Sequence, residues 1–248
     1  MTGIYEFAGK KIEIHSLYEH VHRYCEEYRT DGEPDFVVEI FQEDILAERE
    51  KSKKSAEAEG RRWQEFSEAY LEELAVYRKI SEKMPEYETF LFHGSCIAVD
   101  GIGYLFTAKS GTGKSTHARL WREYLGKRAV MVNDDKPLIR VGEGECIIYG
   151  TPYNGKHGLG NRMAVPLRAI CLLERSEDNW IKPIAKMEAF PLLVQQAYRP
   201  SNGVALAKTI SLLEKMADGV RLYRLGVNMS PEAAKMAWEE MSGETDQN

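Results

Sequence analysis

The segment 108–116, AKSGTGKST, constrains the fold more than any other part of this 248-residue chain. An apolar run at Tyr104–Thr107 precedes it and an amphipathic stretch at Ser115–Leu125 follows it, so we predict a strand, a glycine-rich turn and a helix. Gly111 and Gly113 allow a tight turn with backbone N–H groups facing inward. The positive end of the following helix dipole adds to them. The sequence therefore predicts a phosphate-binding loop (P-loop) at a strand end of an α/β sheet.

Each position of this loop has an expected task. Lys114 is expected to reach the β- and γ-phosphates of a nucleotide, and the Ser115 hydroxyl to bind Mg²⁺. Position 108 holds alanine where the usual motif has glycine. This substitution costs little free energy if Ala108 has a negative φ. ATP and Mg²⁺ are the predicted cofactors, and the predicted nucleotide-binding residues of the loop are Ser110, Gly111, Thr112, Gly113, Lys114, Ser115 and Thr116.

Two adjacent acids end another predicted strand. The apolar run Val130–Val132 leads into Asn133, Asp134 and Asp135. A carboxylate at this strand end can reach a metal held at the loop, and Mg²⁺ needs only one or two carboxylates. One acid could orient the ion while its neighbour accepts a proton from an attacking hydroxyl. The residues alone leave open which acid has which role.

Two further segments are candidates for the site. His93 precedes a predicted hairpin, where it is either a structural histidine or an imidazole that supports an acid or contacts phosphate. The segment 150–162 contains four glycines and three basic side chains. It is either an exposed connector or a loop that closes over the γ-phosphate, with Lys156 as the expected contact. Arg199 is a weaker candidate for stabilising transition-state charge.

The order of these motifs resembles the catalytic domain of HPr kinase/phosphorylase. HGS at 93–95 comes first, then a hairpin, SGTGKS at 110–115 and NDD at 133–135. In most P-loop proteins the strand before the loop belongs to a parallel βαβ sheet. In this chain a predicted hairpin precedes the loop, which resembles HPr kinases and ATP-dependent phosphoenolpyruvate carboxykinases. The resemblance covers residues 89–175 well and the C-terminal helices loosely. It does not extend to residues 1–88, and the chain is similar to single-chain HPr-kinase-like proteins.

The resemblance implies a fold and a set of roles. The fold is an α/β, HPr kinase/phosphoenolpyruvate carboxykinase-like P-loop domain with a mixed sheet and a small N-terminal α+β lobe. Asp134 and Asp135 are implied as catalytic base and metal partner, with His93 and Lys114 completing the catalytic set. Ser115 and Asp135 are the implied metal ligands.

Changes in pattern along the chain predict its organisation. Residues 1–88 are expected to form the small N-terminal lobe with connecting helices, residues 89–242 the catalytic domain, and residues 243–248 a flexible tail. The elements expected in the lobe are strands at 11–15 and 35–41, helices at 17–28 and 61–82, and a solvated helix or connector at 43–60. Those expected in the domain are hairpins at 96–107 and 137–149, strands at 129–132, 169–173 and 221–225, and helices at 115–125, 187–198, 203–217 and 231–241.

Charge and composition exclude several partners. The 33 basic and 39 acidic side chains give a formal net charge of −6, which argues against nucleic-acid binding by phosphate neutralisation. There is no membrane-length apolar run, and the first residues lack the pattern of a secretory signal. We therefore expect a cytoplasmic protein with no membrane partner, and a homo-oligomer is compatible with the sequence. The four cysteines have no CxxC spacing and are expected to be buried thiols.

Three functions follow from these residues. The first is an ATP-dependent kinase that transfers a phosphoryl group to a hydroxyl of a peptide serine, a protein or a small molecule. The second is a nucleotide-dependent regulatory module without turnover. The third is carboxykinase-like chemistry on a small acid, which needs an additional Mn²⁺ site. The intact pair Asp134 and Asp135 favours the kinase, because passive binding requires no base.

Overall fold

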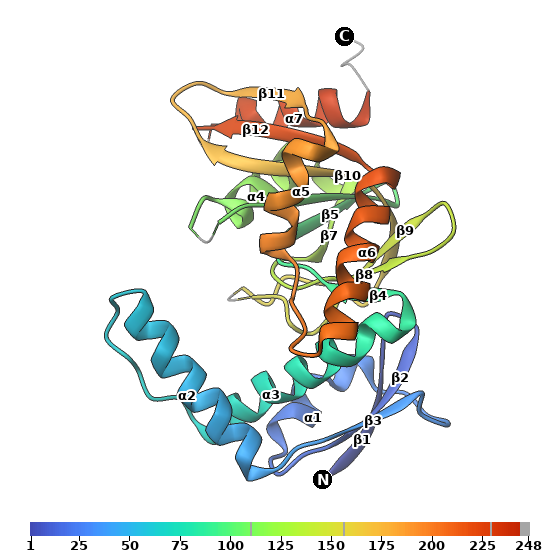
Figure 1. Cartoon of the computed structure of the whole chain (residues 1–248). Helices are drawn as coiled ribbons and strands as arrows, with labels where there is room; N and C mark the ends of the chain where they lie inside the picture. Colours follow the sequence, from blue (N-terminus) through green and yellow to red (C-terminus); the bar gives the residue numbers. More distant parts are fainter. Residues whose placement is uncertain (110, 156, 229, 244–248) are drawn as a thin grey trace. The chain divides into compact units, whose positions relative to one another are not determined.

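The computed structural model describes residues 1–109, 111–155, 157–228 and 230–243 (Figure 1). The predictions for Ser110, Lys156 and the tail residues 244–248 lie outside the described residues. The chain divides into two compact units, Met1–Lys83 and Met84–Asn248. Both units combine helices with sheets, and the larger sheet contains parallel and antiparallel pairs. The predicted α/β class with a mixed sheet is therefore confirmed.

The first unit is a three-stranded sheet with helices. Strand order is β1–β2–β3, with β1 antiparallel and β3 parallel to the central strand. Its alternating buried and exposed residues pack one face of the sheet into the core, as period-two strands do. The elements are β1 Thr2–Phe7, β2 Lys10–His15, α1 His20–Tyr24, η1 Glu26–Tyr28, β3 Phe36–Glu39, α2 Gln42–Ala58 and α3 Glu68–Lys83.

The helix predicted at 61–82 is wrong in its first seven residues. Helix α3 begins at Glu68, where the Ser67 hydroxyl accepts a hydrogen bond from the backbone of Tyr70 (3.3 Å), as an N-cap does. Trp63 lies before the helix and contacts α2 instead, because its indole N–H donates to Ser52 Oγ at 3.2 Å. Trp63 is therefore spaced like the later aromatic residues of α3 but belongs to an irregular segment that packs on α2. Strand β1 was also missed.

The second unit is built on a nine-stranded mixed sheet. Its main path runs β4–β8–β9–β10–β6–β5–β7, and β12 pairs with both β10 and β11. The strands are β4 Thr89–Leu91, β5 Ser95–Val99, β6 Ile102–Thr107, β7 Ala129–Asn133, β8 Leu138–Val141, β9 Cys146–Tyr149, β10 Ala164–Arg175, β11 Trp180–Pro183 and β12 Arg221–Val227. The helices are η2 Met84–Tyr87, α4 Lys114–Leu125, η3 Gly126–Arg128, α5 Lys186–Gln196, α6 Gly203–Gly219 and α7 Pro231–Ser242.

Strand β10 is much longer than the predicted strand at 169–173. Its first residues pair antiparallel with β9, and the remainder lies parallel between β6 and β12. The polar Arg168 and the proline at 166 interrupt the apolar run. The hydrophobic pattern therefore indicates only the later part of the strand, which is buried on both faces. Strands β4 and β11 were missed because each is short and lies at a margin of the sheet.

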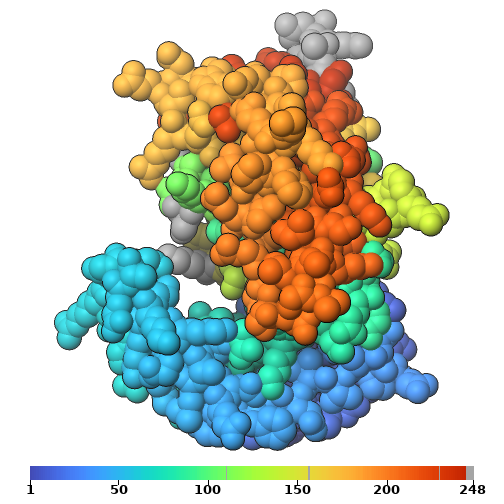
Figure 2. Space-filling view, in the orientation of Figure 1, coloured from blue at the N-terminus to red at the C-terminus, as the bar shows by residue number. Residues whose placement is uncertain are grey.

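Helices cover the sheet on both faces. One core cluster joins α5 and α6 to the sheet, and the other joins α4 and α7 to it. Helices α5 and α6 form the orange surface of this unit in Figure 2. Side chains on β6 alternate between the two clusters, with Leu105 in the first and Phe106 in the second. The loop after β6 leads into α4, which packs in the second cluster.

A buried histidine on α4 should make this unit acid-sensitive. His117 packs edge-to-face on Phe106 (ring centroids 4.7 Å apart), and neither ring nitrogen has a hydrogen-bond partner among the described residues. Burial lowers the pKa of His117 to about 3. Below pH 6.5 His117 is protonated in the unfolded chain but stays neutral in the folded chain. The free energy of unfolding therefore falls as the pH falls toward 3.

We expect His117→Met to remove this dependence. Between pH 7 and pH 4.5 the wild-type chain should lose roughly 2–3 kcal/mol more unfolding free energy than the variant. Urea unfolding of both proteins at the two pH values measures the difference. Equal acid-induced losses in the two proteins would contradict the prediction.

Two further expectations can be compared with the described residues. No helix there is long and apolar enough to cross a membrane. The four cysteines, Cys25, Cys96, Cys146 and Cys171, are free and buried.

Candidate functional site

The glycine-rich loop has the backbone shape that its sequence predicts. Gly111 and Gly113 have φ angles of 76° and 116°, a region that favours glycine. Helix α4 begins directly after Gly113. Ala108 is not among the residues with positive φ, so alanine is tolerated there. A Cβ added at Gly111 would have no atom of the described residues within 4 Å, so there is open space over this part of the loop.

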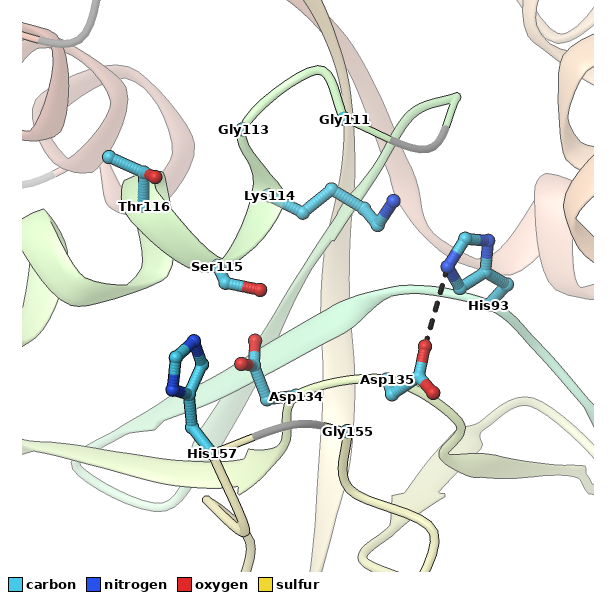
Figure 3. Close-up of a pocket in the computed structure, with 10 residues that line it drawn as sticks. All are labelled: His93, Gly111, Gly113, Lys114, Ser115, Thr116, Asp134, Asp135, Gly155 and His157. Carbon is cyan, nitrogen blue, oxygen red and sulfur yellow. Dashed lines mark ion pairs between the residues drawn. The ribbon is translucent and has the colours of Figure 1, made fainter. Parts of the chain in front are cut away.

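Lys114 lies inside this loop. Its ammonium group donates to the Ala108 carbonyl (3.0 Å), and the residue is only 9 % exposed. Burial lowers the pKa of Lys114, while the carboxylates of Asp135 and Asp134 act in the opposite direction. The ammonium group of Lys114 thus bonds to the backbone of the same glycine-rich loop, and it points toward His93 (Figure 3).

Asp134 is the acid next to the start of α4. Its carboxylate accepts hydrogen bonds from Ser95 Oγ (2.6 Å) and from the Ser115 hydroxyl. Burial raises the pKa of Asp134, and the two serine hydrogen bonds and the charge of His157 oppose that rise. Figure 3 shows the Ser115 hydroxyl and the Asp134 carboxylate pointing toward each other. The Ser115 hydroxyl and the Asp134 carboxylate thus lie close together at the start of α4.

Asp135 faces the opposite end of the site. Its carboxylate lies 3.4 Å from His93 Nε2, and His93 Nδ1 is 3.0 Å from Gln196 Oε1 on α5. The His93 backbone N–H also donates to the Gln196 carbonyl (2.8 Å), so α5 holds the histidine at two points. Burial lowers the pKa of His93, and the charge of Lys114 lowers it further. The imidazole lies between the Gln196 amide and the Asp135 carboxylate, where it can position Asp135.

Asn133, which directly precedes the two acids, makes their side chains point in different directions. The sequence patterns did not predict this role. Its fully buried side chain accepts from the backbone N–H groups of Asp135 (2.9 Å) and Lys136 (2.7 Å). Its amide donates to Thr151 (3.0 Å to the hydroxyl). The chain therefore turns sharply after β7 rather than continuing as a strand. An asparagine directly after an apolar strand was the available signal.

The second glycine-rich segment reaches the same site. A Cβ at Gly150 would lie 1.9 Å from the Asn161 carbonyl oxygen, so only glycine lets the two backbones approach this closely. Asn161 also donates from its backbone to the Val132 carbonyl (3.2 Å) on β7. The segment thereby brings Gly155 and His157 to the cavity, as Figure 3 shows. His157 was missed as a site residue, although its loop was singled out.

These side chains surround a single cavity of about 430 Å³. It brings together His93, Gly111, Gly113, Lys114, Ser115, Thr116, Asp134, Asp135, Gly155 and His157. The predicted residue Thr112 lies on the other side of the loop, where it lines a second cavity. Arg199 lines neither cavity. Arg175, at the end of β10, donates to the Gly111 carbonyl (2.7 Å) and was missed, because its strand is 64 residues away.

No protein-family model matches the chain, and no curated protein matches its sequence. Among solved structures 49 chains match, including the HPr(Ser) kinase/phosphatase from Coxiella burnetii. That match has 10 % sequence identity, covers 62 % of this chain and 97 % of the other, and has a TM-score of 0.35. The function proposed below rests on the residues of this site.

Proposed function

We propose that this chain binds ATP with Mg²⁺ in the cavity of about 430 Å³ around Lys114 and transfers the γ-phosphoryl group to a hydroxyl. The observation that carries the proposal is the convergence of Lys114, Ser115 and two carboxylates on one glycine-lined cavity at a helix N-terminus. Backbone N–H groups and the helix dipole there favour phosphate. The ammonium group and the metal-binding hydroxyl are the two other parts that a P-loop requires.

The oxygen atoms of Ser115 and Asp134 fit a Mg²⁺ ion. Mg²⁺ prefers oxygen ligands and usually keeps several waters while it binds phosphate oxygens. Among the described residues no group of three or more His, Cys, Asp or Glu side chains could hold a metal by itself. The ion would therefore depend on the nucleotide for part of its coordination. When bound, it would neutralise charge that develops on the phosphate oxygens.

This arrangement changes one expected role. The implied metal ligands were Ser115 and Asp135, but Asp134 is the acid that contacts Ser115. We therefore assign Asp134 to the ion and Asp135, beside His93, to the acceptor. Lys114 would exchange the Ala108 carbonyl for the β- and γ-phosphates. Asp135 would accept the hydroxyl proton as the acceptor oxygen bonds to the γ-phosphorus, while the bond from that phosphorus to ADP breaks.

The alternative functions fit the site less well. A regulatory module that only binds nucleotide has no need for the contact between Asp135 and His93 next to the terminal phosphate. Carboxykinase-like chemistry needs a second metal site, and the described residues contain no such cluster. The kinase proposal has a use for both acids and for His93, which the alternatives lack.

ATP binding and turnover test the proposal directly. We expect isothermal titration calorimetry to show Mg²⁺-dependent ATP binding at one site per chain. Incubation with ATP and peptides that contain serine, followed by mass spectrometry, should show a mass increase of one phosphoryl group and formation of ADP. ATP binding without any phosphorylated product in peptide, protein or metabolite mixtures would favour the regulatory module instead.

A further inference from the structure

The glycine-rich loop lies between two cavities. The cavity of about 430 Å³ that we propose for ATP is lined by Gly111 and Gly113. A second cavity of about 240 Å³ is lined by Thr112 of the loop and by Arg175 at the end of β10. Because the loop borders open space on both sides, close packing alone does not fix its shape. Hydrogen bonds to its backbone groups must therefore contribute much of what holds it.

One peptide group of this loop is hydrogen-bonded at both ends. Its carbonyl group, which belongs to Gly111, accepts a hydrogen bond from the Arg175 guanidinium at 2.7 Å. Its N–H group, which belongs to Thr112, donates to the Lys109 carbonyl at 3.3 Å. The peptide bond is trans, so the carbonyl and the N–H point in opposite directions. The contact with Arg175 therefore fixes which way the whole peptide plane faces.

The orientation of this peptide group decides what a bound phosphate meets. The Gly111 carbonyl oxygen faces Arg175, on the side of the second cavity. Rotation of the peptide plane by half a turn would direct this oxygen to the side of the ATP cavity. A phosphate there requires N–H donors, and the partial negative charge of a carbonyl oxygen would repel it. Glycine at position 111 adopts φ angles of either sign, so backbone sterics alone do not prevent the rotation.

The sheet fixes the position of Arg175 independently of the loop. Strands β6 and β10 are parallel, and the last residue of β6, Thr107, pairs with Leu172. Strand β10 continues beyond this point to Arg175, which pairs with Val227 of β12. The guanidinium therefore extends from a paired strand to the loop that follows β6. A side chain on a paired strand holds its partner more precisely than a side chain on a loop does.

We propose that Arg175 is a positioning residue, which holds the Gly111 carbonyl away from the nucleotide so that the N–H groups of the loop face the terminal phosphates. The inference rests on the ATP site proposed above and adds a residue that acts on it through the backbone. Arg175 lines the second cavity and not the first, so its own charge is not placed to contact a phosphate there.

Calorimetric titration of the wild-type chain and of Arg175→Ala with Mg²⁺-ATP and with magnesium and inorganic triphosphate tests this inference. We expect the variant to bind both about tenfold more weakly, because a hydrogen bond from a charged donor is lost. Inorganic triphosphate has no base or ribose, so a matching loss assigns the effect to the phosphates. Arg175→Lys keeps a charged donor and should recover part of the affinity. Millimolar guanidinium should do the same for Arg175→Ala.

Arg224→Ala is the matched control. Arg224 lines the same second cavity, but its guanidinium lies near Glu188 (3.2 Å) and Glu174 (3.8 Å) instead of the loop. This variant should bind ATP as the wild-type chain does, and guanidinium should not change its affinity. Circular dichroism confirms that each variant is folded. The lysine variant keeps the test valid if Arg175→Ala fails to fold.

The possible outcomes separate this inference from the proposed function. Unchanged affinities in Arg175→Ala, a loss confined to ATP, or equal losses in the Arg175 and Arg224 variants would overturn the positioning role and leave the ATP site intact. A loss that neither lysine nor guanidinium reduces would also overturn it, because a general structural defect would then explain the result. No binding of ATP by the wild-type chain would overturn the ATP site and this inference together.

Discussion

Asp135→Asn is expected to lower the rate of phosphoryl transfer by roughly 10²–10⁴-fold while leaving Mg²⁺-ATP affinity nearly unchanged. The amide has the shape of the carboxylate but cannot accept the acceptor's proton. His93 lies 3.4 Å from this group and remains held by Gln196, so the surrounding geometry should persist. Single-turnover measurement of phosphorylated product, together with calorimetric titration of Mg²⁺-ATP, separates the chemical step from binding.

Asp134→Asn is the paired variant, because it changes the acid that contacts Ser115. Here we expect the Mg²⁺-dependent part of ATP affinity to be lost. Asp100→Asn serves as a surface control, since Asp100 pairs with Arg128 in an exposed hairpin turn away from the site. If Asp134→Asn retained Mg²⁺-ATP binding and Asp135→Asn abolished it, the two roles would be reversed. Full turnover in both variants would remove the acids from the mechanism.

Lys114→Ala is expected to weaken ATP binding by about tenfold or more and to reduce phosphoryl transfer below detection. The side chain carries the buried positive charge of the loop, and its removal leaves the terminal phosphates without their charged donor. The Ala108 carbonyl also loses its partner, yet water can replace that hydrogen bond. Calorimetric titration with ATP and with AMP measures the effect, which should be large only for the nucleotide with terminal phosphates.

Lys127→Ala provides the matched lysine control. Lys127 is an exposed residue of η3, at the other end of α4 from the loop, and does not line either cavity. It should bind ATP as the wild-type chain does. Equal ATP affinities of Lys114→Ala and Lys127→Ala would mean that the loop does not hold the terminal phosphates.

Much of the site could be predicted because its main signals are local. A strand, a turn with two glycines and a helix follow one another within about 20 residues, and backbone sterics alone then shape the loop. The acids at the end of β7 were found for the same reason, since an apolar run that meets carboxylates marks a strand end. By contrast, the helix expected at 61–82 relied on spacing alone, and tertiary packing of Trp63 overrode it.

The loop, the acid pair and the mixed α/β class could be predicted because each depends on residues that are close together along the chain. Tertiary structure decided which acid meets which partner. Asn133 captures two backbone N–H groups and turns Asp134 toward Ser115 and Asp135 toward His93. Only the folded sheet brings Arg175 to Gly111 and Gln196 to His93. Such contacts join residues 64 and 103 positions apart, which hydrophobic periodicity does not encode.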